Sequence, residues 1–449
     1  MRLKISFILL SDRDFFKLNI RVSIVAMKSL IILLFWVRSA LCSTISGSFP
    51  PPKDIYIPIL DAYSFDLDGD GTDEIVTTSL NTRDRKAAGP IAVYKYEGKG
   101  KFVDASQLFF LKIPQFFHAR HVLFIPKFKD NHPALFISDH GIDLPPFAGG
   151  FSRLFVWDKS IKKFVDKTEK YGLDHQQAFT FASTFTHLKS NELSLFKANI
   201  SLANSGPEFF IKNKADHFEN ILPNDKEFPR DKCIMNALFA DFDRDGVDEL
   251  FLGGCDMGKR QNNYLENDLI MKLNQKKMRI WKTLPKRNDE PLWGVGAVYA
   301  ESLFSTSKKR SMLDLATVIY NPTFTRGKIN FYQNNGSDLK QIGQFVPARM
   351  IRDFFIPWAQ FLDLDGDGLS EVIGVYRYGP EKPQELVNVT KYFILKNDGK
   401  QFKESSLRLK MPEEQTFVNV LKLKINGIYH LAFPTYNGTI YILDSLPLK

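Results

Sequence analysis

A nine-residue acidic pattern occurs three times in this chain of 449 residues. It has Asp at positions 1, 3 and 5, Gly at position 6 and Glu at position 9, and an apolar segment follows each copy. The copies begin at Asp66, Asp241 and Asp363. Four carboxylates in so short a turn repel one another. Any fold for this chain must therefore neutralise the same acidic turn in three places.

The acidic turns belong to a longer repeat, of which seven units align between residues 53 and 449. Each unit is interpreted as four short strands, because apolar or alternating runs are separated by Gly, Asn, Asp or Pro. Helical periodicity is nearly absent. Four strands per repeat predict an all-β, seven-bladed β-propeller with calcium-binding β-hairpin loops. The last unit supplies three strands, so residues 54–60 (DIYIPIL) are expected to pair with them and close the ring.

The acidic pattern supplies the ligands of a calcium site. A tight turn gathers the carboxylates of positions 1, 3, 5 and 9 and the carbonyl of position 7, and Gly at position 6 permits the turn. Six or seven oxygen ligands suit Ca²⁺ better than Mg²⁺. We expect about three Ca²⁺ ions on this argument. The predicted ligands are Asp66, Asp68, Asp70, Thr72 and Glu74; Asp241, Asp243, Asp245, Val247 and Glu249; and Asp363, Asp365, Asp367, Leu369 and Glu371.

Two alternatives compete with this metal site. An EF-hand needs Glu at position 12 between two helices, whereas this chain has Thr77, Leu252 or Gly374 there and strand-like flanks. The second alternative is an acidic, solvated turn that holds no metal. Three copies of one template favour the metal.

The repeat resembles the FG-GAP or VCBS-type repeats of integrin α-subunit propellers and of exported bacterial proteins. The resemblance covers residues 53–449 and is strongest in the first, fourth and sixth units. It implies calcium loops on one face of the propeller and adhesion or partner binding by loops on the opposite face. The third, fifth and seventh units depart from the metal pattern and are not expected to bind metal.

Residues 1–42 are interpreted as a leader that contains a signal peptide. Met27 is interpreted as the true start, followed by Lys28 and an apolar run of eight residues at 30–37. Ala40 and Cys42 suit cleavage before Ser43. The mature protein is then secreted or periplasmic, with no membrane span. The alternative is an uncleaved amphipathic anchor.

The formal net charge of +9 does not indicate a nucleic-acid partner. The leader alone holds seven Lys or Arg residues against two Asp, and the remaining basic residues are scattered between acidic ones rather than gathered in one stripe. After cleavage, Cys233 and Cys255 remain. They lie nearly opposite each other if the segments around the second acidic turn pair as antiparallel strands, so a disulfide and two buried thiols both remain possible.

Two functional classes stay open. The first is a non-catalytic, calcium-stabilised binding module for an extracellular or periplasmic protein or glycan. The second is an enzyme, polysaccharide lyase-like or hydrolase-like, with its site in the central funnel. The first is favoured because no catalytic constellation emerges. Asp139, His140 and Asp143 share one loop without a nucleophile beside them, and N-x-[ST] triplets begin at Asn199, Asn335, Asn388 and Asn437. The oligomeric state does not follow from the sequence.

Overall fold

The computed structural model describes residues 2–10, 15–23, 44–48 and most of 57–443. The parts of 57–443 outside the described residues are 82–83, 85, 143–147, 174–175, 189–191, 201–205, 223–224, 226–227, 230–231, 256–264, 266, 275–276, 286–293, 305–311, 321–326, 337, 347–353, 356–358, 365–366, 376, 379–391, 406–408, 410–416 and 436–437.

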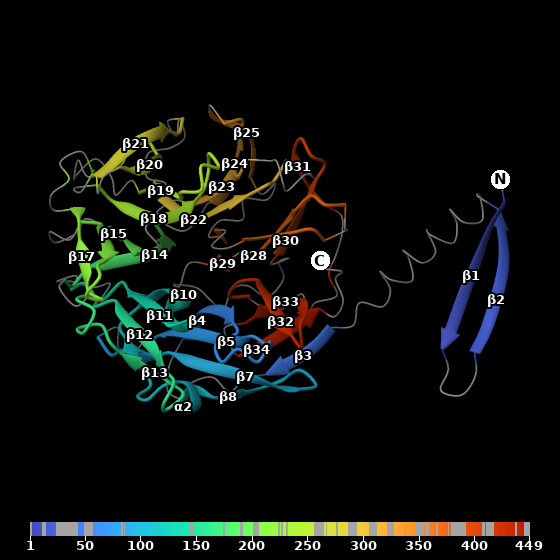
Figure 1. The fold of residues 1–449 in the computed structure, drawn as a ribbon, viewed down its shortest axis with the longest axis horizontal. Helices are drawn as coiled ribbons and strands as arrows, with labels where there is room; N and C mark the ends of the chain where they lie inside the picture. Colours follow the sequence, from blue (N-terminus) through green and yellow to red (C-terminus); the bar gives the residue numbers. More distant parts are fainter. Residues whose placement is uncertain are drawn as a thin grey trace.

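Seven four-stranded antiparallel sheets stand side by side around a ring (Figure 1), which confirms the predicted seven-bladed β-propeller. We number the blades in chain order. Blade 1 contains β4 (Ile57–Phe65), β5 (Glu74–Leu80), β7 (Ala92–Gly98) and β8 (Lys101–Asp104). Blade 2 contains β10 (Ala119–Lys129), β11 (His132–Asp139), β12 (Arg153–Asp158) and β13 (Lys163–Asp166). Blade 3 contains β14 (Phe179–His187), β15 (Leu193–Ile200), β16 (Glu208–Lys212) and β17 (Phe218–Asn220).

The remaining blades repeat this order. Blade 4 contains β18 (Ile234–Ala240), β19 (Glu249–Gly254), β20 (Leu269–Asn274) and β21 (Lys277–Thr283). Blade 5 contains β22 (Gly294–Glu301), β23 (Asp314–Tyr320), β24 (Gly327–Asn334) and β25 (Leu339–Phe345). Blade 6 contains β27 (Ala359–Leu362), β28 (Glu371–Val375), β30 (Tyr392–Asn397) and β31 (Phe402–Glu404). Blade 7 contains β32 (Leu421–Ile425), β33 (Ile428–Pro434), β34 (Thr439–Leu443) and β3 (Thr44–Ser48).

The ring closes through β3, so the prediction that residues 54–60 close it is wrong. Residues Thr44 to Ser48 pair antiparallel with β34, whereas Ile57 already belongs to the first strand of blade 1. The closing strand therefore precedes residue 53, where the propeller was expected to begin. This pairing joins the two ends of the ring and gives β34 a partner along its outer edge.

Seven of the hydrophobic clusters of the described residues lie one between each pair of neighbouring blades. Phe196 of blade 3 and Leu250 of blade 4, for example, share one cluster. Because both faces of a blade pack on a neighbour, its second strand is apolar on both sides: all residues of β19 and β23 are buried. This packing explains the continuous apolar runs that follow the acidic turns.

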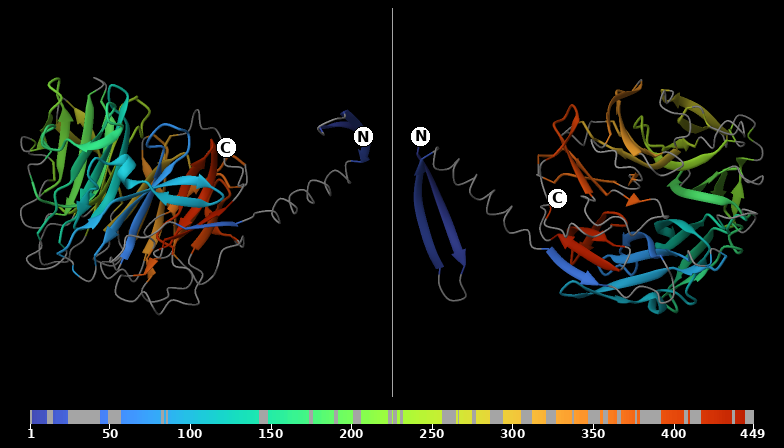
Figure 2. Two further views of the ribbon diagram at one scale, coloured as in Figure 1. Left: turned by 90° about the horizontal axis from the view of Figure 1, so that it is seen from below. Right: turned by 180° about the vertical axis from the view of Figure 1, so that it is seen from behind.

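Several further elements lie outside the blades. They are β1 (Arg2–Leu10) with β2 (Phe15–Ser23), β6 (Gly89–Pro90) with β9 (Gln115–Phe116), β26 (Phe354–Phe355) with β29 (Arg377–Tyr378), and the one-turn helix α2 (Ser106–Phe109). The hairpin of β1 and β2 lies apart from the ring in every view (Figures 1 and 2). The predicted signal peptide, from Met27 to the cleavage point, lies outside the described residues. Among the described helices, none has the length and hydropathy needed to cross a membrane.

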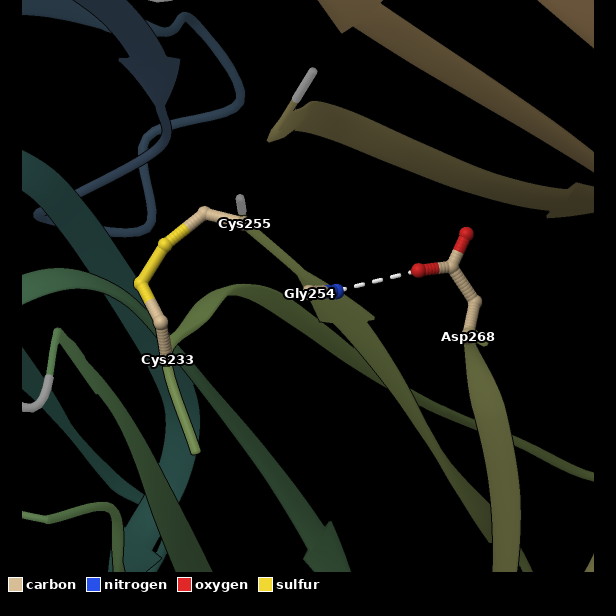
Figure 3. Close-up of a disulfide and its surroundings, with 4 residues drawn as sticks. All are labelled: Cys233, Gly254, Cys255 and Asp268. Carbon is tan, nitrogen blue, oxygen red and sulfur yellow. Dashed lines mark hydrogen bonds between the residues drawn. A yellow bond between two sulfur atoms is a disulfide. The ribbon is translucent and has the colours of Figure 1, made fainter. Parts of the chain in front are cut away.

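Cys233 and Cys255 form a disulfide with their Cα atoms 5.5 Å apart, which decides between the two alternatives of the sequence. Figure 3 shows the bond between the two cysteines. Cys233 precedes β18 and Cys255 follows β19, so the bond joins the ends of this hairpin farthest from its acidic turn. The neighbouring Gly254 N–H donates to Asp268 Oδ1 at 3.0 Å. Both cysteines pack in a cluster with Phe179, Ile200 and Tyr320. The disulfide thus ties blade 4 at a point where side chains of blades 3 and 5 meet it.

Candidate metal sites

The first acidic loop joins β4 to β5 and folds around its own carboxylates. One oxygen of each carboxylate accepts a backbone N–H, which fixes where the side chain points. The bonds run from Leu67 to Glu74 Oε2 at 2.9 Å, from Asp70 to Asp68 Oδ1 at 3.2 Å, from Gly71 to Asp66 Oδ2 at 3.1 Å and from Thr72 to Asp70 Oδ1 at 2.8 Å.

The second acidic loop, between β18 and β19, repeats these bonds residue by residue. They run from Phe242 to Glu249 Oε2 at 2.9 Å, from Asp245 to Asp243 Oδ1 at 3.2 Å, from Gly246 to Asp241 Oδ2 at 3.1 Å and from Val247 to Asp245 Oδ1 at 2.8 Å. Two loops far apart in sequence therefore share one backbone structure.

The third loop, between β27 and β28, has the same bonds where it is described. Leu364 donates to Glu371 Oε2 at 2.8 Å, Gly368 to Asp363 Oδ2 at 3.0 Å and Leu369 to Asp367 Oδ1 at 2.8 Å. Asp365 lies outside the described residues. Strands flank all three loops, as expected for the propeller pattern and contrary to an EF-hand.

The backbone bonds leave one oxygen of each of these carboxylates without a backbone donor. Within the described residues, Asp66 Oδ1, Glu74 Oε1, Asp241 Oδ1 and Glu249 Oε1 are buried and accept no hydrogen bond. Oxygens of Asp66, Asp68 and Asp70 lie within 4.8 Å of one another, and those of Asp241, Asp243 and Glu249 do the same. Ca²⁺ binds oxygen at about 2.3–2.6 Å. A cation of this size fits between oxygens with this spacing. The backbone carbonyls of Thr72, Val247 and Leu369 remain ligands that only the sequence predicts.

The glutamate at position 9 has a raised pKa in the first two loops. Glu74 is fully buried, and burial, followed by the nearby charge of Asp68, raises its pKa to about 8. Burial and the charge of Asp243 likewise raise the pKa of Glu249 to about 7. A carboxylate held in this environment favours any cation that approaches it.

A lysine of the third strand reaches each of the two fully described loops. Lys95 Nζ lies 2.9 Å from Asp70 Oδ2 and 3.6 Å from Glu74 Oε1. Lys272 Nζ lies 3.3 Å from both Asp245 Oδ2 and Glu249 Oε1. These lysines were not among the residues predicted from the sequence. The sequence feature that could have indicated them is a Lys in the third strand of each unit with an acidic loop. It occurs in the segments AVYKYEG, LIMKLN and YFILKN.

Position 8 of each acidic loop contacts the preceding blade. Asp73 Oδ2 accepts the N–H of Lys424 in blade 7 at 2.8 Å. Asp248 accepts the hydroxyl of Thr186 in blade 3, and Ser370 donates to Glu301 of blade 5 at 3.4 Å. An acidic loop that is held rigid therefore also holds the contact between two blades.

In blade 5, which lacks the acidic pattern, Asp314 stands at the position that corresponds to the position-9 glutamate. Asp314 pairs with Glu301 as Glu74 pairs with Phe65 in blade 1. The Asp314 carboxylate accepts the N–H groups of Leu303 at 2.9 Å, Phe304 at 3.1 Å and Asn334 at 2.9 Å. Backbone donors thus take up both of its oxygens, in agreement with the departure of this unit from the metal pattern.

Asp139 and His140 are engaged within the fold. Asp139 accepts the N–H groups of Phe117 at 3.3 Å, His118 at 2.9 Å and Gly141 at 2.9 Å. The His140 ring packs edge-on against Phe179 and Phe181, with centroid distances of 4.9 and 4.7 Å. These contacts favour a structural role for both residues. Asp143 lies outside the described residues.

The N-x-[ST] triplets differ in exposure. Asn199 is fully buried and its side chain donates to Gly206 O at 2.7 Å, so it presents no acceptor for a glycan. Asn335 is exposed in the turn between β24 and β25. Asn388 and Asn437 lie outside the described residues.

The sequence matches no protein-family model and no curated protein. Similar solved structures include a protein from Lactobacillus plantarum, with a TM-score of 0.45 and 11% identity over 80% of this chain and 86% of that one. They also include Sqt1 of Saccharomyces cerevisiae, with a TM-score of 0.45 and 9% identity over 90% and 96%. A third is an ulvan lyase of polysaccharide lyase family PL25, with a TM-score of 0.48 and 10% identity over 88% and 94%. These values describe similarity of chain path and transfer no function.

Proposed function

We propose that this chain is an exported, calcium-binding β-propeller that acts as a non-catalytic binding or adhesion module for a protein or glycan. The observation that carries the proposal is the carboxylate cradle built twice with the same hydrogen bonds. Each copy gathers carboxylate oxygens within 4.8 Å of one another and leaves one buried oxygen at position 1 and one at position 9 without a hydrogen bond. A hard divalent cation satisfies such oxygens.

Calcium in these loops would stabilise the ring. Each loop joins the first two strands of a blade, and its position 8 contacts the preceding blade through Asp73, Asp248 or Ser370. A cation that fixes the loop therefore strengthens the contact between blades as well as the hairpin.

Partner binding is assigned to the face opposite the acidic loops. In an up-and-down blade, the turns after the first and third strands lie at one end, and the turns after the second strand and between blades lie at the other. Much of the chain that connects the second strand of each blade to the third lies outside the described residues. Binding is favoured over catalysis because Asp139 and His140, the acid-base candidates of the sequence, are held in backbone and aromatic contacts.

Calcium binding is tested by thermal unfolding in EDTA and in Ca²⁺. The wild-type melting temperature should rise with Ca²⁺, because a ligand that binds only the folded state adds about 2.7 kcal/mol per site at 100 times its Kd. The triple variant Asp68→Ala, Asp243→Ala, Asp365→Ala should lose this response. The control replaces the exposed Glu97, Glu219 and Glu404 with Ala, which changes the net charge equally. This control should keep the Ca²⁺ response of the melting temperature. An unchanged Ca²⁺ response in the first variant refutes the site.

The binding role is tested separately. The chain from Ser43 onward is screened against glycans and proteins, and in parallel for degradation of polysaccharides. Saturable binding without turnover is expected. Turnover of a polysaccharide would contradict a non-catalytic role and support the enzyme.

A further inference from the structure

The ammonium group of Lys95 stands among the predicted ligands of the first site. Its Nζ lies 2.5 Å from Asp68 Oδ2, 2.9 Å from Asp70 Oδ2 and 3.6 Å from Glu74 Oε1. The oxygens that it contacts on Asp68 and Asp70 are those that accept no backbone N–H in this loop. Lys95 therefore uses the oxygens that a metal would need.

Lys272 repeats this arrangement in the second site. Its Nζ contacts Asp243 Oδ2 directly and lies 3.3 Å from Asp245 Oδ2 and from Glu249 Oε1. The three partners hold positions 3, 5 and 9, as they do for Lys95. Two independent blades thus place an ammonium at the same point of the same cradle.

Strand register explains why the arrangement recurs. Ile75 pairs with Tyr94 and Leu250 with Met271, so the next residues bring Glu74 opposite Lys95 and Glu249 opposite Lys272. In blade 6, Val372 pairs with Leu395, which brings Glu371 opposite Lys396. In blade 5, where backbone N–H groups satisfy Asp314, the corresponding residue is Gln333. Each blade with an acidic loop therefore carries a lysine opposite the glutamate of position 9.

We propose that Lys95 and Lys272, and by strand register Lys396, are tethered counter-cations that occupy the metal position of the calcium-free protein and must leave it when Ca²⁺ binds. This inference rests on the proposed calcium sites. Calcium bound at about 2.3–2.6 Å from the same oxygens leaves no room for an ammonium at hydrogen-bonding distance. The side chains of Lys95 and Lys272 are 31% and 29% exposed, so each can move its ammonium into solvent.

Two consequences follow for the proposed function. The ammonium neutralises part of the clustered charge, so the loops keep their fold without metal. Calcium must break the ion pairs of the lysine before it binds, so each lysine sets the calcium concentration at which its site fills. These lysines therefore raise the calcium concentration that is needed to fill the sites.

The test replaces the three lysines with Met, which keeps the aliphatic stem and removes the ammonium. The control replaces the exposed Lys101, Lys159 and Lys400 with Met and changes the net charge equally. Calcium affinity is measured by titration calorimetry after removal of bound metal, and melting temperature is measured in EDTA. The variant at the three loops should bind Ca²⁺ at least tenfold more tightly than the wild type and the control, and should melt at a lower temperature in EDTA.

The outcomes separate this inference from the calcium sites themselves. Calcium binding by all proteins with the same affinity overturns the counter-cation role and leaves the sites standing. If none binds Ca²⁺ but the loop variant alone melts earlier in EDTA, the calcium sites fail and the lysines stand as permanent counter-cations. Binding by the loop variant alone supports the inference. If the triple variant does not fold, Lys272→Met alone should tighten one site and leave the others unchanged, and an unchanged titration overturns the proposal.

Discussion

Gly69 and Arg244 occupy the same fourth position of two acidic loops, and both adopt left-handed backbone angles, with φ of +78° and +61°. Glycine reaches this region without cost, whereas a residue with Cβ loses about 1–2 kcal/mol there. The second loop thus has the same backbone conformation as the first, although Arg244 disfavours left-handed backbone angles. The hydrogen bonds to the carboxylates, which are the same in both loops, determine the conformation.

The first prediction concerns this backbone position. Gly69→Ala should lower the free energy of unfolding by about 1 kcal/mol, because Ala resists the left-handed region. No atom lies within 4 Å of the Cβ that this substitution adds, so steric contact contributes nothing. Urea unfolding measures the change. Gly343→Ala is the matched control, since its Cβ also meets no atom and its φ is not left-handed. Equal effects of the two substitutions would contradict the argument.

The second prediction concerns the closing strand. A chain that starts at Ser43 keeps β3, whereas a chain that starts at Lys53 loses its five residue pairs with β34. The shorter chain should melt at a lower temperature and aggregate, because an unpaired edge strand attracts other strands. Circular dichroism and light scattering compare the two. The predicted cleavage before Ser43 leaves β3 intact, so the longer chain should behave like the full ring. Equal stability of both chains would show that β3 does not hold the ring closed.

The sequence carries most of the fold but leaves specific contacts undetermined. The acidic turns and apolar runs predict the strands, because local periodicity and turn chemistry determine them. The closing strand was misplaced because Thr44–Ser48 has no apolar run of its own and pairs with residues almost 400 positions away. Lys95 was not predicted for a related reason: its contact with the acidic loop follows only from the register between β5 and β7. The cysteine pairing needed the same kind of information, because spacing permits a bond without requiring one.

The third prediction concerns the disulfide. Cys233→Ala with Cys255→Ala should lower the free energy of unfolding by about 3 kcal/mol, because the bond restricts the unfolded chain over a separation of 22 residues. Urea unfolding with and without dithiothreitol measures it. The reductant should destabilise the wild type and leave the double variant unchanged. The same response in both proteins would mean that the bond contributes no stability.

The fourth prediction concerns the buried glutamates without calcium. Burial raises the pKa of Glu74 to about 8, whereas the unfolded chain titrates near 4.5, so the folded state holds a proton that the unfolded state has lost. In EDTA, stability from this group is fully present below the unfolded pKa and is lost as pH rises through about 8. Glu74→Gln should flatten the pH dependence of the melting temperature, and Glu97→Gln, at an exposed site, should not. Calcium binding needs the ionised carboxylate, so affinity should increase over the same interval.

The fifth prediction concerns His140, whose ring is buried among Phe179, Phe181 and His118. Burial, followed by the charge of Arg120, holds the pKa of His140 well below its ordinary value of 6.5. The unfolded chain therefore takes up a proton below pH 6.5 that the folded state refuses, and stability falls as pH falls. The slope from one such group is at most about 1.4 kcal/mol per pH unit.

His140→Leu isolates this contribution. At saturating Ca²⁺ the acidic loops hold the same charge in wild type and variant, so the difference between their pH profiles reports the histidine. Urea unfolding at pH 7, 6 and 5 should show the wild type losing stability faster than the variant. His132, at the partly buried start of β11, provides the control, because its substitution by Leu leaves the buried imidazole of His140 in place. Parallel profiles for wild type and His140→Leu would mean that the folded protein admits a charged imidazolium at this position.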